Sequence, residues 1–138
     1  MTDDAPPSGL SERRQRGLAK MSEVYSFDVN DGPGDFFGIT VEHLFGDVWT
    51  RPALDVASRR LLTIGAIVGV GRLEVLEIQF QSALDNGELT PEQIREVVIH
   101  LTHYTGWPSG AAVFNISEQV IGRWEKAQAA AGRAEPPA

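Results

Sequence analysis

The sequence predicts an all-α protein, a single domain of about six helices. Apolar residues recur at helical spacing along most of the chain, and no stretch alternates apolar and polar residues as a half-buried strand does. Residues that start and stop helices fall at the ends of these stretches. With 138 residues, the chain is long enough to bury one core.

Turn or capping residues mark most ends of the expected helices. The helices cover about residues 12–25, a short segment starting near 40, 56–70, 72–85, 91–105 and 110–127. The clearest start is Thr90, an N-cap followed by Pro91 at the first helical position and by Gln93, which closes a capping box. Asn86-Gly87 ends the preceding helix, because Gly readily adopts the positive φ found just past a helix end.

The two ends of the chain are poor in large apolar residues. Residues 1–9 are expected to form a flexible leader and residues 128–138 a flexible tail, which leaves a helical domain at 10–127. The helix at 56–70 is apolar on nearly every side after Arg60. Such a helix must be covered on every side, so we expect a subunit interface and a homo-oligomer.

Composition narrows the possible partners. The net charge of -7 argues against non-specific binding to nucleic acid or to an anionic membrane. The most apolar run, Leu61 to Val70, falls short of the roughly 17–25 residues of a spanning helix. The chain has no cysteine, which excludes disulfides and thiolate nucleophiles. We expect a cytoplasmic protein whose partners are a small molecule and copies of itself.

Three stretches carry a family resemblance: GDVWTRPALD at 46–55, RRLLTIGAIVGVGR at 59–72 and ALDNGELTPEQIREVVIHLTHYTGWP at 83–108. Through them the chain resembles the carboxymuconolactone decarboxylase family, within the superfamily of the peroxidase alkylhydroperoxidase D. The resemblance extends over about Gly17 to Gly122. It implies an alkylhydroperoxidase D-like helical fold, assembled as trimers or hexamers with pockets near subunit boundaries. It also implies a lyase of aromatic catabolism that decarboxylates 4-carboxymuconolactone without any cofactor.

The resemblance also locates a departure from the family. The redox branch of the superfamily carries a Glu, two Cys and a His, which fall here at Arg60, Arg72, Val75 and Gln79. All four are missing, so thiol peroxidase activity is excluded. The decarboxylase branch usually keeps the His, and Gln79 cannot move a proton at neutral pH. Either another residue supplies the acid, or the substrate differs, or catalysis has been lost.

A cofactor-free decarboxylase needs a cation for the substrate carboxylate, donors for the enolate oxygen and an acid for carbon. Arg51 and Arg59 are candidates for the carboxylate, with a structural ion pair as the alternative. Gln79 is a candidate substrate-binding residue. Trp49 and Trp107 flank prolines and are expected either to floor the pocket or to lie in a core or interface.

The candidate catalytic residues lie on the helix at 91–105. His100, His103 and Glu96 share one side of it, roughly opposite Ile94 and Val97, and a carboxylate beside an imidazole orients it. Tyr104 is a candidate donor to an enolate oxygen. The alternative is a solvated polar face. No metal is expected, because H-E-x-x-H is absent.

Three functions follow from these residues. The first is a cofactor-independent lyase acting on a small carboxylated lactone or related acid in a pocket between subunits. The second is an oligomeric binding protein that has kept the pocket and lost the proton donor. The third is a cofactor-free isomerase or lactone hydrolase that uses the same residues.

Overall fold

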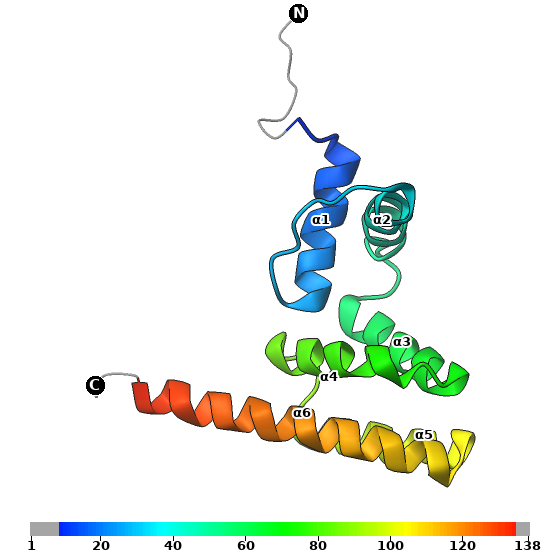
Figure 1. Ribbon diagram of the computed structural model, residues 1–138, viewed down its shortest axis with the longest axis vertical. Coiled ribbons are helices and arrows are strands. Elements are labelled where there is room, and N and C mark those ends of the chain that lie inside the picture. The colour runs from blue at the N-terminus through cyan, green and yellow to red at the C-terminus, as the bar shows by residue number, and fades with distance from the viewer. Residues whose placement is uncertain (1–8, 135–138) are drawn as a thin grey trace, which may run out of the picture. The chain divides into compact units, whose positions relative to one another are not determined.

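The computed structural model describes residues 9–134. Its elements are α1 (Glu12–Tyr25), α2 (Asp35–Ile39), the π-helix η1 (Thr40–Val48), α3 (Val56–Val70), the 3₁₀ turn η2 (Leu73–Val75), α4 (Leu76–Asp85), α5 (Pro91–Thr105) and α6 (Trp107–Ala134) (Figure 1). Residues 9–134 contain no strand, and the predicted all-α class is confirmed. The elements form two compact units that divide after Arg59.

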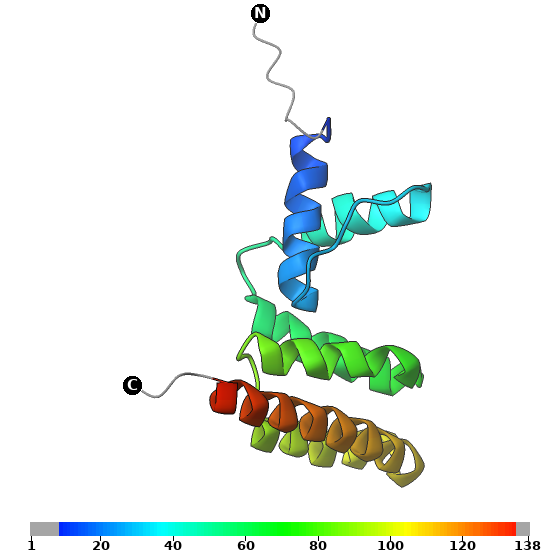
Figure 2. The ribbon, with the colours of Figure 1, turned by 60° about the vertical axis from the view of Figure 1, so that its left-hand side comes forward.

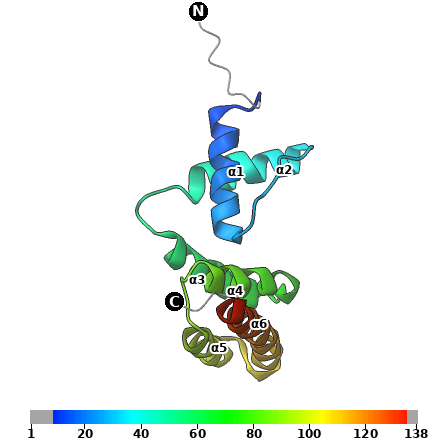
Figure 3. The same ribbon diagram turned by 90° about the vertical axis from the view of Figure 1, so that its left-hand side faces the viewer.

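In the first unit, α1 crosses η1 (Figures 2 and 3). Val24, Phe45 and Trp49 form its buried core, in which the rings of Phe45 and Trp49 stack with centroids 6.0 Å apart. Gly17 allows the two helices to approach, because a Cβ at this position would overlap the backbone carbonyl of Val41. Of the two roles expected for Trp49, the structure places its side chain in the core.

We therefore expect Gly17→Ala to destabilise the protein by about 3 kcal/mol, the upper range for an overpacked site, because the obstacle is backbone and cannot change rotamer. The free energy of unfolding in urea measures the effect. Gly122→Ala is the matched control, since a Cβ on this exposed α6 residue meets open space. The control should be stabilised by up to about 1 kcal/mol through helix propensity. A Gly17→Ala protein as stable as the control would contradict the packing.

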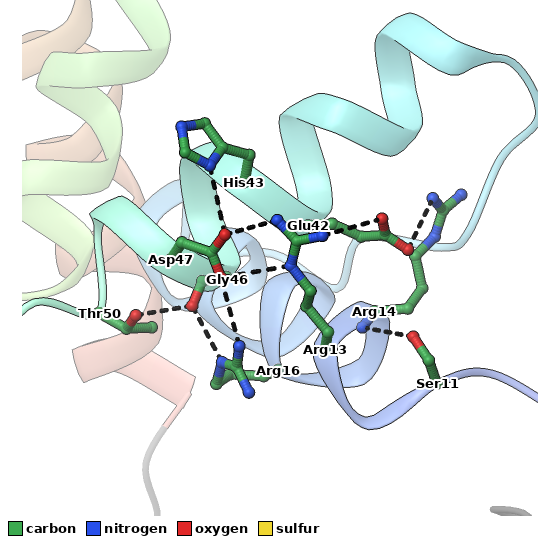
Figure 4. A network of polar contacts seen from close by, with 9 residues as sticks. All are labelled: Ser11, Arg13, Arg14, Arg16, Glu42, His43, Gly46, Asp47 and Thr50. Carbon is green, nitrogen blue, oxygen red and sulfur yellow. Dashed lines mark hydrogen bonds and ion pairs between the residues drawn. The ribbon is translucent and has the colours of Figure 1, made fainter.

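A polar network fastens α1 to η1 on the surface of this unit (Figure 4). Asp47 lies at its centre and accepts hydrogen bonds from Arg13 and Arg16, while His43 Nδ1 lies 3.2 Å from its Oδ2. The bond from Arg13 is the main cause that lowers the pKa of Asp47 from 3.8 to about 2. Desolvation is the second largest effect and opposes it, while the contacts with His43 and Arg16 lower the pKa further. The network thus favours the ionised carboxylate.

This network makes the stability of the first unit depend on acid. Because the pKa of folded Asp47 lies below its value of 3.8 in the unfolded chain, its contribution is complete above about pH 4 and is lost as the pH falls to about 2. We expect the difference in unfolding free energy between the native protein and Asp47→Asn to be constant above pH 4 and to close towards pH 2. A difference that persists unchanged to pH 2 would contradict this assignment.

The second unit is a two-layer arrangement of helices, with α3 and α4 in one layer and α5 and α6 in the other (Figures 2 and 3). Its core is the apolar set Ile64, Val68, Leu76, Phe80, Leu84, Ile94, Val98, Val113, Val120 and Ile121. The capping box of Thr90 and Gln93 is confirmed, and so is the positive φ of Gly87. None of the described helices has the length and apolar character needed to cross a bilayer.

Three expected boundaries differ from the structure. The segment expected from near Thr40 is already helical at Asp35, where Gly34, with a φ of 94°, turns the chain into the helix. The helix expected from residue 72 begins with the 3₁₀ turn η2, because Gly71, with a φ of 73°, interrupts the helical backbone just before it. The last helix begins at Trp107 and not after Ser109, since proline is tolerated in a first helical turn.

The expected leader lies almost entirely outside the described residues, and the expected tail lies outside them only in its last four residues. Residues 1–8 and 135–138 are not described. The tail expected to fray from Gln128 is helical as far as Ala134, which fits the high helix propensity of its alanines. Its side chains from 128 to 133 are exposed.

Candidate active site

The clearest pocket lies between α5 and α6 and has a volume of about 330 Å³. This is at the lower end of the range of roughly 300–1,000 Å³ typical of small-molecule sites. Most of its wall is apolar, and its lining residues are Val98, Ile99, Thr102, His103, Trp107, Gly110, Ala111 and Phe114. Two predicted site residues, His103 and Trp107, therefore share one pocket.

His103 has a defined orientation in this pocket. Its Nδ1 lies 2.7 Å from the backbone oxygen of Ile99. A carbonyl oxygen only accepts, so Nδ1 carries a hydrogen and Nε2 is the nitrogen free to take up or release a proton. The rings of His103 and Trp107 pack edge to face, with centroids 5.4 Å apart. The arrangement places a group capable of proton transfer beside a largely apolar wall.

The floor of the pocket depends on a close approach of α5 and α6. A Cβ on Gly110 would overlap the side chain of Thr102, which is buried and whose hydroxyl donates to the carbonyl of Val98 at 2.7 Å. Any larger residue at 110 would push the two helices apart. The sequence analysis did not single out Gly110 or Thr102, and helical spacing alone gives no signal for this contact.

His100 lies at the edge of a different pocket. Together with Glu96, Val97, Leu101 and Leu61 of α3 it lines a pocket of about 410 Å³. Both histidines lie on the exposed face of α5, as expected, but they border pockets on opposite flanks of the helix. Val97 lines this pocket with Glu96 and His100 and so does not lie opposite them, which corrects the expectation. Ile94 is buried in the core, whereas Val97 is partly buried and packs against it.

Two other candidates on α5 are exposed. No hydrogen bond joins Glu96 to His100 among the described residues. The ring of Tyr104 tilts against that of His100 with centroids 5.0 Å apart, and 77% of Tyr104 is exposed. Tyr104 therefore contacts the ring of His100, and it lines neither the pocket of His103 nor the pocket of His100.

The arginines predicted to bind carboxylate belong to the first unit. Arg51 is exposed. Arg59 donates to the backbone oxygens of Arg51 and Leu54, at 3.1 and 3.2 Å. It thereby fastens the loop that leads into α3, whose N-cap Asp55 accepts from the backbone N–H of Ser58. This bond lowers the pKa of Asp55.

Gln79 is buried in the second unit, where it meets two residues that sequence reasoning did not select. Its side-chain oxygen accepts from Arg60, which also forms a two-pronged ion pair with Glu88. Arg60 is completely buried. The sequence does contain a signal for this cluster, because Arg60 is a charged residue near the start of a helix that is apolar on nearly every side after it. A charge buried in such a helix requires a partner. Within residues 9–134 no group of His, Asp or Glu side chains could hold a metal ion.

The described residues thus form an all-α fold with a largely apolar pocket between α5 and α6. A sequence model described as the carboxymuconolactone decarboxylase family matches residues 34–119, more than half of the chain. The chain belongs to this family, and the predicted membership is confirmed.

Two characterised relatives agree with this assignment. The chain is 30% identical to 4-carboxymuconolactone decarboxylase of Acinetobacter baylyi over 118 residues, which cover 80% of this chain and 87% of the relative. It is 36% identical to nitrosuccinic acid decarboxylase npaB of Metarhizium robertsii over 83 residues, which cover 60% of this chain and 57% of that relative. Both relatives are decarboxylases, which supports carboxy-lyase activity for this chain.

Proposed function

We propose that this protein is a cofactor-independent decarboxylase that acts on a small carboxylated lactone or a related acid. The observation that carries the proposal is the position of His103 at an apolar pocket in a chain whose relatives decarboxylate 4-carboxymuconolactone and nitrosuccinic acid. Both of these substrates are small acids with a carboxylate to lose. A pocket of about 330 Å³ is large enough for either.

The proposed chemistry follows from the electrons that remain after carbon dioxide leaves. The carbon–carboxylate bond breaks, its electron pair spreads into the adjacent acceptor group as an enolate or its equivalent, and the carbon is then protonated. His103 is the proposed acid in its imidazolium form: Nδ1–H is held by the oxygen of Ile99, and Nε2–H delivers its proton to the carbon. Solvent returns a proton to Nε2 before the next turnover. Trp107 and Phe114 supply an apolar wall beside the developing charge, and this wall excludes water once a second subunit covers it.

The assembly is proposed to be a homo-oligomer with the pocket near a subunit boundary. Large apolar side chains on α3, Leu62 and Val70, are 63% and 72% exposed in the single chain. Trp107 and Phe114 at the pocket are 66% and 52% exposed, so a second subunit would complete the wall. A trimer or hexamer is expected by sedimentation, and a monomer at micromolar concentration would contradict this part of the proposal.

A non-catalytic small-ligand-binding protein is the second candidate. The observation that favours it is Gln79, which stands where the decarboxylase branch usually carries a His and cannot act as an acid. An isomerase or lactone hydrolase would use the same pocket and the same His103. Identification of the product separates this last possibility, because only a decarboxylase releases carbon dioxide.

The test is to incubate the purified native protein with 4-carboxymuconolactone and, separately, with nitrosuccinic acid, and to follow carbon dioxide release. We expect turnover of at least one of the two acids without added metal or cofactor. Binding of both acids with no product would favour the binding protein, and a product that retains the carboxylate would favour the isomerase or hydrolase. Gln79→His, assayed beside the native protein, reports whether the family residue increases the rate.

A further inference from the structure

Arg60 and Glu88 form a buried ion pair inside the second unit. The side chain of Arg60 is fully buried and that of Glu88 is 8% exposed. Arg60 Nε lies 3.0 Å from Glu88 Oε1, and its Nη2 lies 3.2 Å from Oε2. This two-pronged contact fixes the plane of the guanidinium. The charges of the pair cancel, so the cluster presents no net charge to its surroundings.

The guanidinium in turn fixes the orientation of Gln79. Arg60 Nη1 donates to Gln79 Oε1 at 2.7 Å. Because a guanidinium carries donors only, the amide oxygen must face Arg60, and the amide nitrogen Nε2 faces the other way. The usual ambiguity between the oxygen and nitrogen of a glutamine side chain is thereby removed.

The amide nitrogen of Gln79 carries two hydrogens, each of which can be donated in a hydrogen bond. No described residue accepts a hydrogen bond from Gln79 Nε2, although the residue is only 6% exposed. Among the described residues, Trp124 Nε1 is the one enclosed side-chain polar atom without a partner. The Gln79 nitrogen is therefore not enclosed, and its N–H groups reach the surface of the unit.

We propose that Arg60 and Glu88 are positioning residues that hold the amide of Gln79 so that its Nε2 donates to an anionic oxygen of the substrate. Because Gln79 is not among the residues that line the pocket of His103 in its own chain, the substrate that it contacts lies in the pocket of a neighbouring subunit of the proposed oligomer. The ligand chemistry is a carboxylate oxygen or the enolate oxygen formed after decarboxylation. The positive guanidinium on the amide oxygen polarises the amide and strengthens its N–H groups as donors. A donor held in place before charge develops costs no reorganisation during the reaction. This inference rests on the proposed decarboxylase function.

Gln79→Glu is the discriminating variant. A glutamate has the same shape and keeps an acceptor for Arg60, but it has no N–H to donate and adds a negative charge. We expect a folded protein whose kcat is lower by about 10²-fold, the loss typical of one oxyanion donor. If Gln79 only packs against Arg60, the variant keeps kcat, and the proposal is overturned.

The role of the ion pair is tested by Glu88→Gln and by Arg60→Lys, a conservative replacement that keeps the charge. Neither replacement can grip Gln79 and residue 88 in the native geometry, so we expect kcat to fall and KM to change little. In a protein that already carries Glu88→Gln or Arg60→Lys, we expect Gln79→Glu to lower kcat less than it does in the native protein, because the amide that it replaces is no longer oriented. Losses that simply multiply in the double variants would contradict the positioning role.

A binding measurement separates failure of this inference from failure of the proposed function. Side-chain amide signals are followed by nuclear magnetic resonance while succinate, a stable dicarboxylate, is added. We expect the Gln79 signals to shift along a binding curve and those of the exposed Gln93 to stay fixed. Carbon dioxide release with unmoved Gln79 signals would overturn the inference alone. Shifted signals without carbon dioxide release would support the donor site and overturn the decarboxylase function, and the absence of both would overturn the two proposals.

Discussion

Replacement of His103 by alanine is expected to lower the decarboxylation rate by about 10²- to 10⁴-fold, the usual contribution of a general acid. The reason is that His103 lines the pocket, that Nε2 is its free nitrogen because Nδ1 is held by Ile99, and that no other imidazole lines this pocket. The variant should keep the oligomeric mass and the unfolding free energy of the native protein, because the side chain is exposed. Single-turnover measurement of carbon dioxide release gives the rate.

The three histidines of the chain provide the comparison. His43→Ala is the control, since His43 belongs to the surface network around Asp47. Its rate should remain that of the native protein. His100→Ala distinguishes the two pockets of α5. A large loss at His100 with none at His103 would contradict the assignment and would move the acid to the pocket bordered by Glu96 and Leu61.

Arg60→Met is expected to cost about 3–5 kcal/mol of unfolding free energy, the largest loss of stability expected here, because it leaves the carboxylate of Glu88 buried without its partner. Urea unfolding of the native and variant proteins measures it. The double variant Arg60→Met/Glu88→Met should recover most of the loss, since both charges are then removed from the interior. A double variant no more stable than Arg60→Met alone would contradict the interpretation.

An exposed ion pair is the matched control for this prediction. Arg95 of α5 contacts Glu118 of α6 through two hydrogen bonds of 2.8 and 3.2 Å, but its side chain is 44% exposed. Arg95→Met should therefore destabilise the protein far less than Arg60→Met, because water replaces the lost contact. The comparison isolates burial as the cause, since both pairs have the same two-pronged geometry.

The helices and their ends could be predicted because the signals are local. Ser11 caps α1, Asp55 caps α3, and Thr90 with Gln93 closes the capping box of α5. Each cap depends on atoms within three residues of one another, so the sequence contains the whole arrangement. The predictions differed from the structure where a glycine with positive φ, at 34 or 71, moved a helix start by a few residues.

Only the tertiary structure decided which polar residues meet. Helical spacing placed His100 and His103 on one face of α5, but the neighbours that divide this face into two pockets are Leu61 of α3 and the residues of α6. Helical periodicity describes one helix and carries no information on the helix packed beside it.

The sequence by itself determined the all-α class, the family, the caps and the apolar faces, because each follows from residues a few positions apart. The tertiary structure alone brought Arg60 to Gln79 and Glu88, which are 19 and 28 residues further along the chain. A buried charge is tolerated only where folding supplies its partner, and the identity of that partner is set by how the helices pack.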